Sequence, residues 1–385
     1  MASQQRSALI VGAGIAGLAT ARALQRTGWK VHVVERSGTL QPIGTGITIW
    51  ANGTRALERL GLLGAFQDAS LPVGGSSHDQ FGNVLASFSS DDMRHRYGHP
   101  LRAIHRSDLT TLLNDSLYVN TVHLGLQAVK FRRDPHGGTV MLNNGGSMHA
   151  DLVIGADGLR SLVRHDLVGD GAPRPSGITA MRAVCPIGDL DPDWLPWGES
   201  WGNGEVFGMV PLPGGLVYWY ATMPNAALAQ DGDVLWRTLA LQRFERWHPA
   251  IRGVILATKS QDIMAHELFD RKPVLAWSGS HATLVGDAAH PMLPFLGQGA
   301  GQALEDAVAL ADALAADWNI TTALRSYEQA RAPHAAKVVK GSRKMASMAR
   351  EQKPWKQKLQ RSVISMLPQA VVHRQLDDVV GRVKS

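Results

Sequence analysis

Three glycines near the start of this 385-residue chain have a spacing that could bind a nucleotide. Gly12, Gly14 and Gly17 form GxGxxG in the stretch GAGIAG. In such a loop the first glycine permits a tight turn, the second lets a pyrophosphate approach the backbone, and the third lets helix and strand pack closely. Glu35 ends the next apolar run, where a carboxylate can accept hydrogen bonds from ribose hydroxyls. This pattern predicts a site for the adenosine half of a dinucleotide, without separating NAD from FAD.

Two later stretches also combine glycine with aspartate. GADG spans 155–158, and GDAAHPMLPFLGQGAGQALEDA spans 286–307. In the longer stretch, Asp287 could hydrogen-bond a polyol hydroxyl. Gly297, Gly299 and Gly301 would leave backbone N–H groups open at the start of a helix, where negative charge is favoured. A single nucleotide-binding loop would account for one glycine-rich stretch after a strand, but this chain has three.

The elements that must position these loops follow from the hydrophobic pattern. Apolar runs at 7–11, 152–155 and 282–285 predict a buried strand before each loop, and helical periodicity follows the first and third loops. Between 173 and 277, short alternating runs predict antiparallel strands, and seven of the chain's 11 tryptophans lie there. We therefore expect an α/β fold: a Rossmann-like lobe with an inserted antiparallel-sheet lobe and a C-terminal helical segment.

The motifs in this order resemble those of the single-component flavoprotein aromatic hydroxylases, the family of para-hydroxybenzoate and salicylate hydroxylases. The resemblance rests on GAGIAG with Glu35, on IHRSDL, on IGADGLRSLVR and on the 286–307 stretch. It implies a discontinuous FAD-binding domain (1–72, 99–172 and 278–350), a substrate-binding domain (73–98 and 173–277) and a basic helical tail (351–385).

The same resemblance implies the cofactors and the reaction. FAD would be reduced by NADH or NADPH, and a flavin hydroperoxide would transfer one oxygen atom of dioxygen to an aromatic substrate. Arg106 would contact the flavin nucleotide, Asp287 the ribitol chain, and residues 297–300 the pyrimidine edge of the flavin. The implied cofactor contacts are Gly12, Ala13, Gly14, Ile15, Ala16, Gly17, Glu35, Arg36, Arg106, Val129, Asp157, Asp287, Pro294, Gly297, Gln298, Gly299 and Ala300.

The substrate is less constrained. Relatives that hydroxylate urate carry an arginine where this chain has Val206, so we expect a neutral or lipophilic aromatic such as a phenol, quinolone or polyketide ring. The tryptophan-rich insertion is a candidate cover that excludes water from the reaction. Expected substrate contacts are Val206, Met209, Tyr218, Pro294 and Phe295. Tyr218 and Trp219 are equally well explained as core residues of a sheet. No catalytic residue is predicted.

Three alternatives share the FAD lobe. An epoxidase would use the same oxygen chemistry, whereas a reductase of isoprenoid double bonds would consume no oxygen. A flavin-binding redox sensor would show no turnover.

Other chemistries lack support in the sequence. Cys185 is the only cysteine, no histidine spacing predicts a metal site, and the hydrolase signature GxSxG does not occur. His290 lies beside Asp287, but the family pattern makes a structural role more plausible than a general base.

The net charge of +6 is concentrated at the C-terminal end, where residues 331–385 hold 13 Lys or Arg and three Asp or Glu. We expect a solvated helix covering the body in preference to a membrane-surface helix, and no nucleic-acid partner. Apolar tail residues at helical spacing are Trp355, Leu359, Val363, Met366 and Leu367. No apolar run reaches the length of a membrane span, no signal pattern is evident, and we expect a cytoplasmic protein.

Overall fold

The computed structural model describes residues 5–40, 45–225, 236–353, 355–357 and 376–381. Four of the five apolar tail residues named above lie outside the described residues; Trp355 is described and exposed. Among the described residues, no helix combines the length and the apolar character that a membrane crossing requires.

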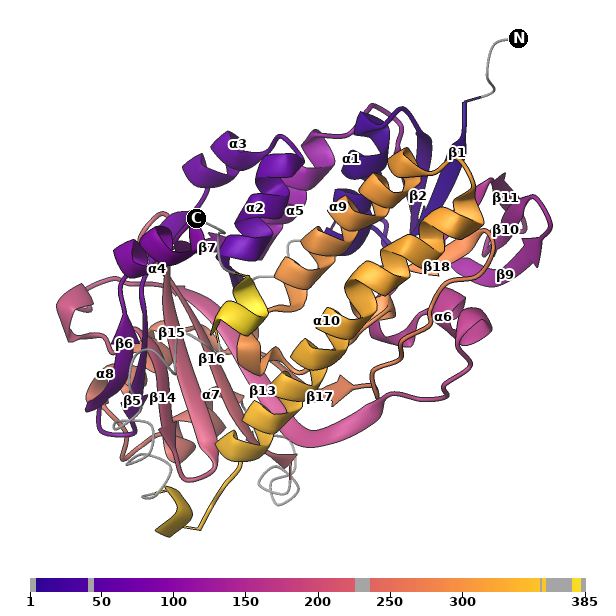
Figure 1. The fold of residues 1–385 in the computed structure, drawn as a ribbon. Helices are drawn as coiled ribbons and strands as arrows, with labels where there is room; N and C mark the ends of the chain where they lie inside the picture. Colours follow the sequence, from indigo (N-terminus) through magenta and orange to yellow (C-terminus); the bar gives the residue numbers. More distant parts are fainter. Residues whose placement is uncertain (1–4, 41–44, 226–235, 354, 358–375, 382–385) are drawn as a thin grey trace.

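A five-stranded parallel sheet carries the three glycine loops (Figure 1). Its order is β18-β12-β1-β2-β8, and every neighbouring pair is parallel. The strands are β1 Ser7–Val11, β2 Lys30–Glu35, β8 Val122–Leu124, β12 Leu152–Gly155 and β18 Ala282–Leu284. Because β1, β12 and β18 are neighbours, the loops that follow them meet at one carboxyl edge of the sheet, where open α/β sheets bind their ligands.

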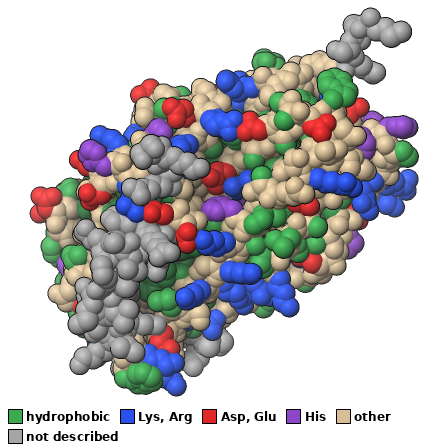
Figure 2. Space-filling view, viewed as in Figure 1, with side chains coloured by type: hydrophobic (Ala, Val, Ile, Leu, Met, Phe, Trp, Pro, Cys, Tyr) green, Lys and Arg blue, Asp and Glu red, His purple; other side chains and the backbone are tan. Residues whose placement is uncertain are grey.

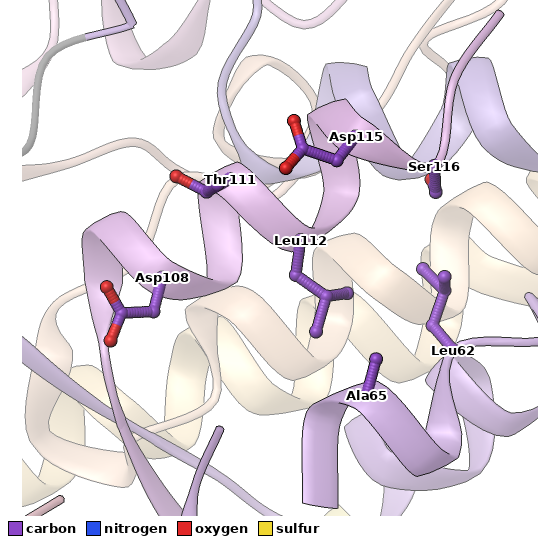
Figure 3. A pocket seen from close by; sticks show the side chains of 7 residues that line it. All are labelled: Leu62, Ala65, Asp108, Thr111, Leu112, Asp115 and Ser116. Carbon is purple, nitrogen blue, oxygen red and sulfur yellow. The ribbon is translucent and has the colours of Figure 1, made fainter. Parts of the chain in front are cut away.

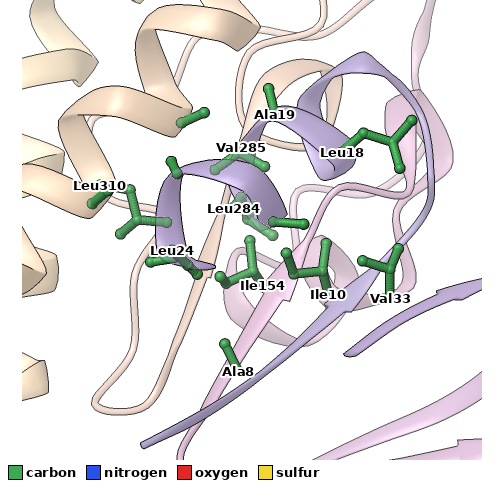
Figure 4. Close-up of a cluster of buried hydrophobic side chains, with 14 of the residues drawn as sticks. Ala8, Ile10, Leu18, Ala19, Leu24, Val33, Ile154, Leu284, Val285 and Leu310 are labelled. Atoms are coloured by element: carbon green, nitrogen blue, oxygen red, sulfur yellow. The ribbon is translucent and has the colours of Figure 1, made fainter. Parts of the chain in front are cut away.

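Helices pack on this sheet and form the larger core (Figure 4). Leu18 and Leu24 of α1 (Ile15–Arg26) lie against Ile10, Ile154 and Leu284 of the strands. Helix α9 (Gly299–Ala316) packs on α1, and the long helix α10 (Ile320–Ala349) packs on α9. The predicted α/β fold class is confirmed.

Smaller elements surround this core. A hairpin is formed by β10 Gly137–Leu142 and β11 Ser147–Ala150, and β9 Ala128–Asp134 completes its sheet. A second three-stranded sheet has the order β3-β7-β4. The remaining elements here are β3 Gly46–Ile49, β4 Leu71–Val73, β7 Leu101–His105, α2 Ala51–Arg59, α3 Leu63–Asp68, α4 Ser90–Tyr97, α5 Arg106–Asp115 and α6 Leu162–Leu167.

A seven-stranded sheet of order β17-β13-β16-β15-β14-β5-β6 forms the other part of the molecule. All its neighbouring pairs are antiparallel except β14 with β5, which is parallel. The strands are β5 Gly75–Asp79, β6 Val84–Phe88, β13 Arg174–Pro186, β14 Gly198–Gly202, β15 Glu205–Leu212, β16 Leu216–Pro224 and β17 Met264–Asp270.

Two helices in this region were not predicted, α7 (Trp236–Arg243) and α8 (Pro249–Ala257). Both pack on one face of the seven-stranded sheet, where Trp219 stacks on Phe207 with ring centroids 5.3 Å apart. Trp219 is fully buried there, as core packing of large aromatic rings favours. This tryptophan therefore belongs to the core and does not form the expected cover.

Candidate active site

The first glycine loop has the close packing that its spacing predicts. Gly12 has φ +103°, and a Cβ there would lie 2.5 Å from the carbonyl oxygen of Ala156. A Cβ on Gly17 would lie 1.9 Å from the carbonyl oxygen of Gly12. At Gly14, in contrast, a Cβ would meet no atom within 4 Å. The outer glycines are thus required by the protein's own packing, and the middle one leaves room for a ligand to approach.

Glu35 holds this loop from the end of β2. Its carboxylate accepts hydrogen bonds from the N–H of Ala13 (2.8 Å) and from the N–H of Ser37 (2.9 Å). Arg36 is exposed beside it, and Val129, at the start of β9, is 51% exposed. Glu35 therefore orders the glycine loop in addition to any bond that it makes to a ligand.

The loop after β12 places Asp157 beside the third loop. One carboxylate oxygen, Oδ2, accepts a hydrogen bond from the N–H of Leu162 (2.7 Å), and Oδ1 is buried with no partner among the described residues. The short helical turn Gly158–Arg160 that follows contacts the turn Gly286–Ala288. Burial raises the pKa of Asp157, against the opposing effect of its hydrogen bonds.

Asp287 and Arg106 bring opposite charges to the same region. The Asp287 side chain is accessible to solvent, although its neighbours in the turn, Gly286 and Ala288, are buried. The surrounding protein raises the pKa of Asp287, and His290 and Arg106 oppose that rise. Arg106 begins α5, and burial lowers its pKa while Asp287 acts to raise it. An accessible carboxylate near a guanidinium suits recognition of a hydroxyl-rich ligand.

The third loop ends at the start of α9. Pro294–Leu296 form a helical turn, Gly297 has φ +60°, and Gly299 is the first residue of the helix. A Cβ on Gly297 would lie 3.1 Å from Nε1 of Trp50, and one on Gly299 would meet nothing within 4 Å. The backbone is therefore open at a helix N-terminus, which favours negative charge in a bound group.

Residues that the sequence analysis did not identify surround this helix start. Asn52 of α2 donates from Nδ2 to Oε1 of Gln298 (3.0 Å) and to Glu305 (3.2 Å). Trp50 Nε1, Asn52 Oδ1 and Gln298 Nε2 are buried and have no partner among the described residues. Trp50 and Asn52 lie in ITIWANG, which carries no nucleotide signature, so only the fold reveals them.

The predicted structural role of His290 agrees with its contacts. Its Nε2 lies 2.6 Å from Oδ2 of Asp306, and both side chains are buried. Arg331 donates from Nε to the other oxygen of Asp306 (2.8 Å). A histidine engaged in this way connects the loop to α9 and is not free to act as a base.

The expected substrate contacts separate onto two faces of the seven-stranded sheet. Tyr218 is opposite Val210, and Val206 is opposite Thr222, so these four residues share one face. We call it the site face, because Tyr218 packs there with Ala103 of β7 and lies against Gly46 of β3. Tyr218 is 8% exposed, and its hydroxyl has no hydrogen-bond partner among the described residues.

Met209 does not fit its predicted role. It is opposite Trp219 and packs with Phe207 beneath α7 and α8, on the face away from Tyr218. Residues on a strand alternate between faces, so a substrate beside Tyr218 cannot reach Met209. Phe295, in contrast, packs with Leu293 and with Ala180 of the site face.

The comparisons with known proteins agree with this geometry. A sequence model of the family described as FAD binding domain matches residues 5–342. An aurachin C monooxygenase/isomerase from Stigmatella aurantiaca is 38% identical over 87% of each chain. A 3-hydroxybenzoate 6-hydroxylase from Aquipseudomonas alcaligenes is 33% identical, again over 87% of each chain. This chain belongs to the FAD-dependent aromatic hydroxylase family. Among solved structures, Klebsiella pneumoniae HpxO complexed with FAD and uric acid has a TM-score of 0.89, at 26% identity, covering 97% of this chain and 96% of that chain.

The residues described above fit the FAD of this hydroxylase family. The middle glycine of the first loop and Gly299 leave the backbone open, and Asp157 Oδ1 and Gln298 Nε2 lack partners among the described residues. Asp287 offers an accessible carboxylate in the turn that contacts both the Asp157 loop and α9. An extended dinucleotide needs polar groups at both ends and in the middle, and the three loops supply them.

A separate pocket of about 520 Å³ lies between α3 and α5 (Figure 3). None of its lining residues belongs to the three loops or to the site face; they are Leu62, Ala65, Asp108, Thr111, Leu112, Asp115 and Ser116. It is an open hollow on the protein surface.

Proposed function

We propose that this protein is an NADH- or NADPH-dependent monooxygenase that inserts one oxygen atom of dioxygen into an aromatic small molecule. The observation that carries the proposal is that three loops with room for FAD meet at one sheet edge, with Tyr218 on a facing sheet. Bound FAD supplies the electron transfer and the oxygen chemistry. The relatives named for aurachin C and for 3-hydroxybenzoate support an aromatic substrate.

The chain's own residues have distinct tasks in this proposal. Asp287 holds the ribitol chain, and the start of α9 at Gly299 stabilises negative charge on the reduced ring. The Tyr218 hydroxyl donates a hydrogen bond to the substrate. Apolar neighbours of Tyr218 exclude water from the reacting atoms, and they include Ala103, Val210 and Leu212.

The proposed FAD-binding and substrate-binding parts correspond to the two main sheets. The five-stranded sheet belongs to the FAD-binding part, and the seven-stranded sheet to the substrate-binding part. Strands β5 and β6 join the second sheet although they lie early in the chain, which supports assigning 73–98 together with 173–277. The remaining cofactor contacts are proposed as stated in the sequence analysis.

The proposal is tested with purified protein and a panel of aromatic compounds. We expect bound FAD, and oxidation of NADH or NADPH that accelerates when a suitable aromatic is added, with matching oxygen uptake. Reduction of a double bond without oxygen uptake would instead support the isoprenoid reductase alternative. A protein that binds FAD but oxidises neither nucleotide with any compound in the panel would support the redox-sensor alternative.

A further inference from the structure

The site face of the seven-stranded sheet carries an arginine that the sequence analysis did not consider. Arg182 lies on β13 directly opposite Tyr220 of β16, and Tyr220 shares a face with Tyr218, their ring centroids being 5.6 Å apart. Alternation along β13 puts Ala180, Arg182 and Val184 on this face. Arg182 is therefore two strands away from Val206, the position at which urate-hydroxylating relatives carry their arginine.

The neighbours of Arg182 along its strand locate it within the site. On one side, Ala180 packs with Leu293 and Phe295, in the loop that leads to the start of α9. On the other side, Val184 packs with Tyr218. Along the strand, Arg182 thus lies between the residue that packs on the 293–295 loop and the residue that packs on Tyr218, the proposed hydrogen-bond donor to the substrate.

No carboxylate among the described residues compensates this guanidinium. Arg182 is half-buried, and among the described residues it forms no ion pair or hydrogen bond. Its electrostatic neighbours include Arg106 and His266. Burial is the main cause that lowers the pKa of each, and Arg182 lowers both further, while Asp287 opposes the change at Arg106. Desolvating a cation beside other basic groups is unfavourable unless an anion joins them.

The nearest acid on the same sheet face is already engaged. Glu199 accepts hydrogen bonds from the Tyr220 hydroxyl (2.6 Å) and from Trp201 Nε1 (3.1 Å). Tyr220 reaches it by lying across Gly208, where a Cβ would be 2.1 Å from the ring. Glu199 is three strands from Arg182, which at the usual strand spacing is roughly 14 Å.

We propose that Arg182 binds an anionic oxygen, a carboxylate or an ionised ring hydroxyl, carried by the aromatic substrate. A guanidinium matches such a group with two parallel hydrogen bonds. The anionic end of the substrate then lies over β13, and its apolar body lies over Tyr218. This inference rests on the proposed function and replaces the expectation of a neutral substrate, which depended on Val206 alone.

The test uses two matched pairs of probes with FAD-loaded protein. One pair is 3-hydroxybenzoate and 3-hydroxybenzamide, and the other is 4-nitrophenolate and 4-nitroanisole. Binding is measured by the change in flavin absorbance for wild type, Arg182→Gln, Arg182→Lys and Arg252→Gln. Arg252 is exposed on α8, which packs on the opposite face of the sheet, so its substitution removes the same charge away from the site.

In the wild type we expect the anion of at least one pair to bind about 10-fold or more tightly than its neutral partner. Arg182→Gln should weaken binding of that anion about 10- to 100-fold and leave the neutral partner unchanged, as loss of a charged hydrogen bond predicts. Arg182→Lys should retain part of the preference, and Arg252→Gln all of it. The pair that responds tells a carboxylate from a ring hydroxyl.

Three results would overturn the role of Arg182. They are a wild type that binds FAD but prefers neither anion, an Arg182→Gln variant that binds the anion as Arg252→Gln does, and loss of FAD binding in Arg182→Gln. The last would assign the guanidinium to the cofactor. A wild-type protein that cannot bind FAD would contradict the proposed function itself, which separates the two failures.

Discussion

Nε2 of His290 lies 2.6 Å from Oδ2 of Asp306, and the same carboxylate oxygen accepts the N–H of Gly286 at 2.9 Å. Asp306 is fully buried on α9, and Arg331 of α10 binds its other oxygen. This one side chain therefore connects the turn that carries Asp287 to two helices. The position of the Asp287 carboxylate, the proposed ribitol contact, therefore depends on this buried network.

Replacing Asp306 with asparagine should destabilise the protein strongly. The change removes the fully buried carboxylate that binds Arg331 and leaves this arginine only its ion pair with the partly exposed Glu305 (3.3 Å). Breaking a buried pair costs about 3–5 kcal/mol. Urea unfolding of both proteins measures the difference. Asp312→Asn is the matched control, because Asp312 and its partner Arg59 are both more than half exposed, and its loss should cost less than about 1 kcal/mol. Equal effects of the two substitutions would argue against the network.

The contribution of Asp306 should also depend on pH. Burial acts to raise its pKa, but His290 and Arg331 outweigh burial and hold the pKa below the usual value. A carboxylate with a lowered pKa stabilises the fold above its unfolded pKa, about 3.9, and this stability is lost as pH falls through the lowered value. The difference in unfolding free energy between wild type and Asp306→Asn should therefore stay constant near neutrality and shrink below about pH 4. A difference that shrinks only above pH 6 would contradict this assignment.

Glu35→Gln should weaken FAD binding about 10- to 100-fold, since hydrogen bonds to a charged acceptor are worth about 1.5–3 kcal/mol. Quenching of FAD fluorescence on titration with apoprotein measures the affinity. Glu58→Gln, at a half-exposed position on α2, provides the control and should bind FAD as the wild type does. If both variants bound FAD equally well, Glu35 would have only the loop contacts to Ala13 and Ser37.

Tyr218→Phe should raise the KM for the aromatic substrate about 5- to 10-fold and uncouple NAD(P)H oxidation from product formation, because one hydrogen bond to the substrate is lost. Steady-state kinetics with product quantification measure both effects. Tyr118→Phe, at an exposed position, is the control. Unchanged KM and coupling in Tyr218→Phe would leave Tyr218 as a residue of the sheet core alone.

The convergence of the three glycine loops could be predicted from the sequence because its signals are local. Each loop follows its own strand, so the parallel order of β1, β12 and β18 brings Gly12, Asp157 and Asp287 together without any further assumption. The family pattern predicted a structural role for His290, but its partner Asp306, 16 residues further along the chain, became evident only in the fold.

The substrate side depends on which face of a strand each residue occupies, and that is set by distant contacts. Met209 was assigned to the site because it lies near Val206 in sequence, but α7 and α8 cover its face. Arg182 was overlooked because it lies on β13, and only the pairing of β13 with β16 places it opposite Tyr220.

The basic character of the C-terminal region is visible on α10, where Figure 2 shows Lys and Arg side chains gathered on the surface.

The most direct test of the central claim is the source of oxygen in the product. The FAD-loaded protein is incubated with NADH or NADPH, isotopically labelled dioxygen and the aromatic compound that best stimulates nucleotide oxidation, and the product is identified by mass. We predict that one labelled oxygen atom appears in the aromatic product for each molecule formed. A product without label, or nucleotide oxidation that yields only hydrogen peroxide with every aromatic in the panel, would contradict a monooxygenase.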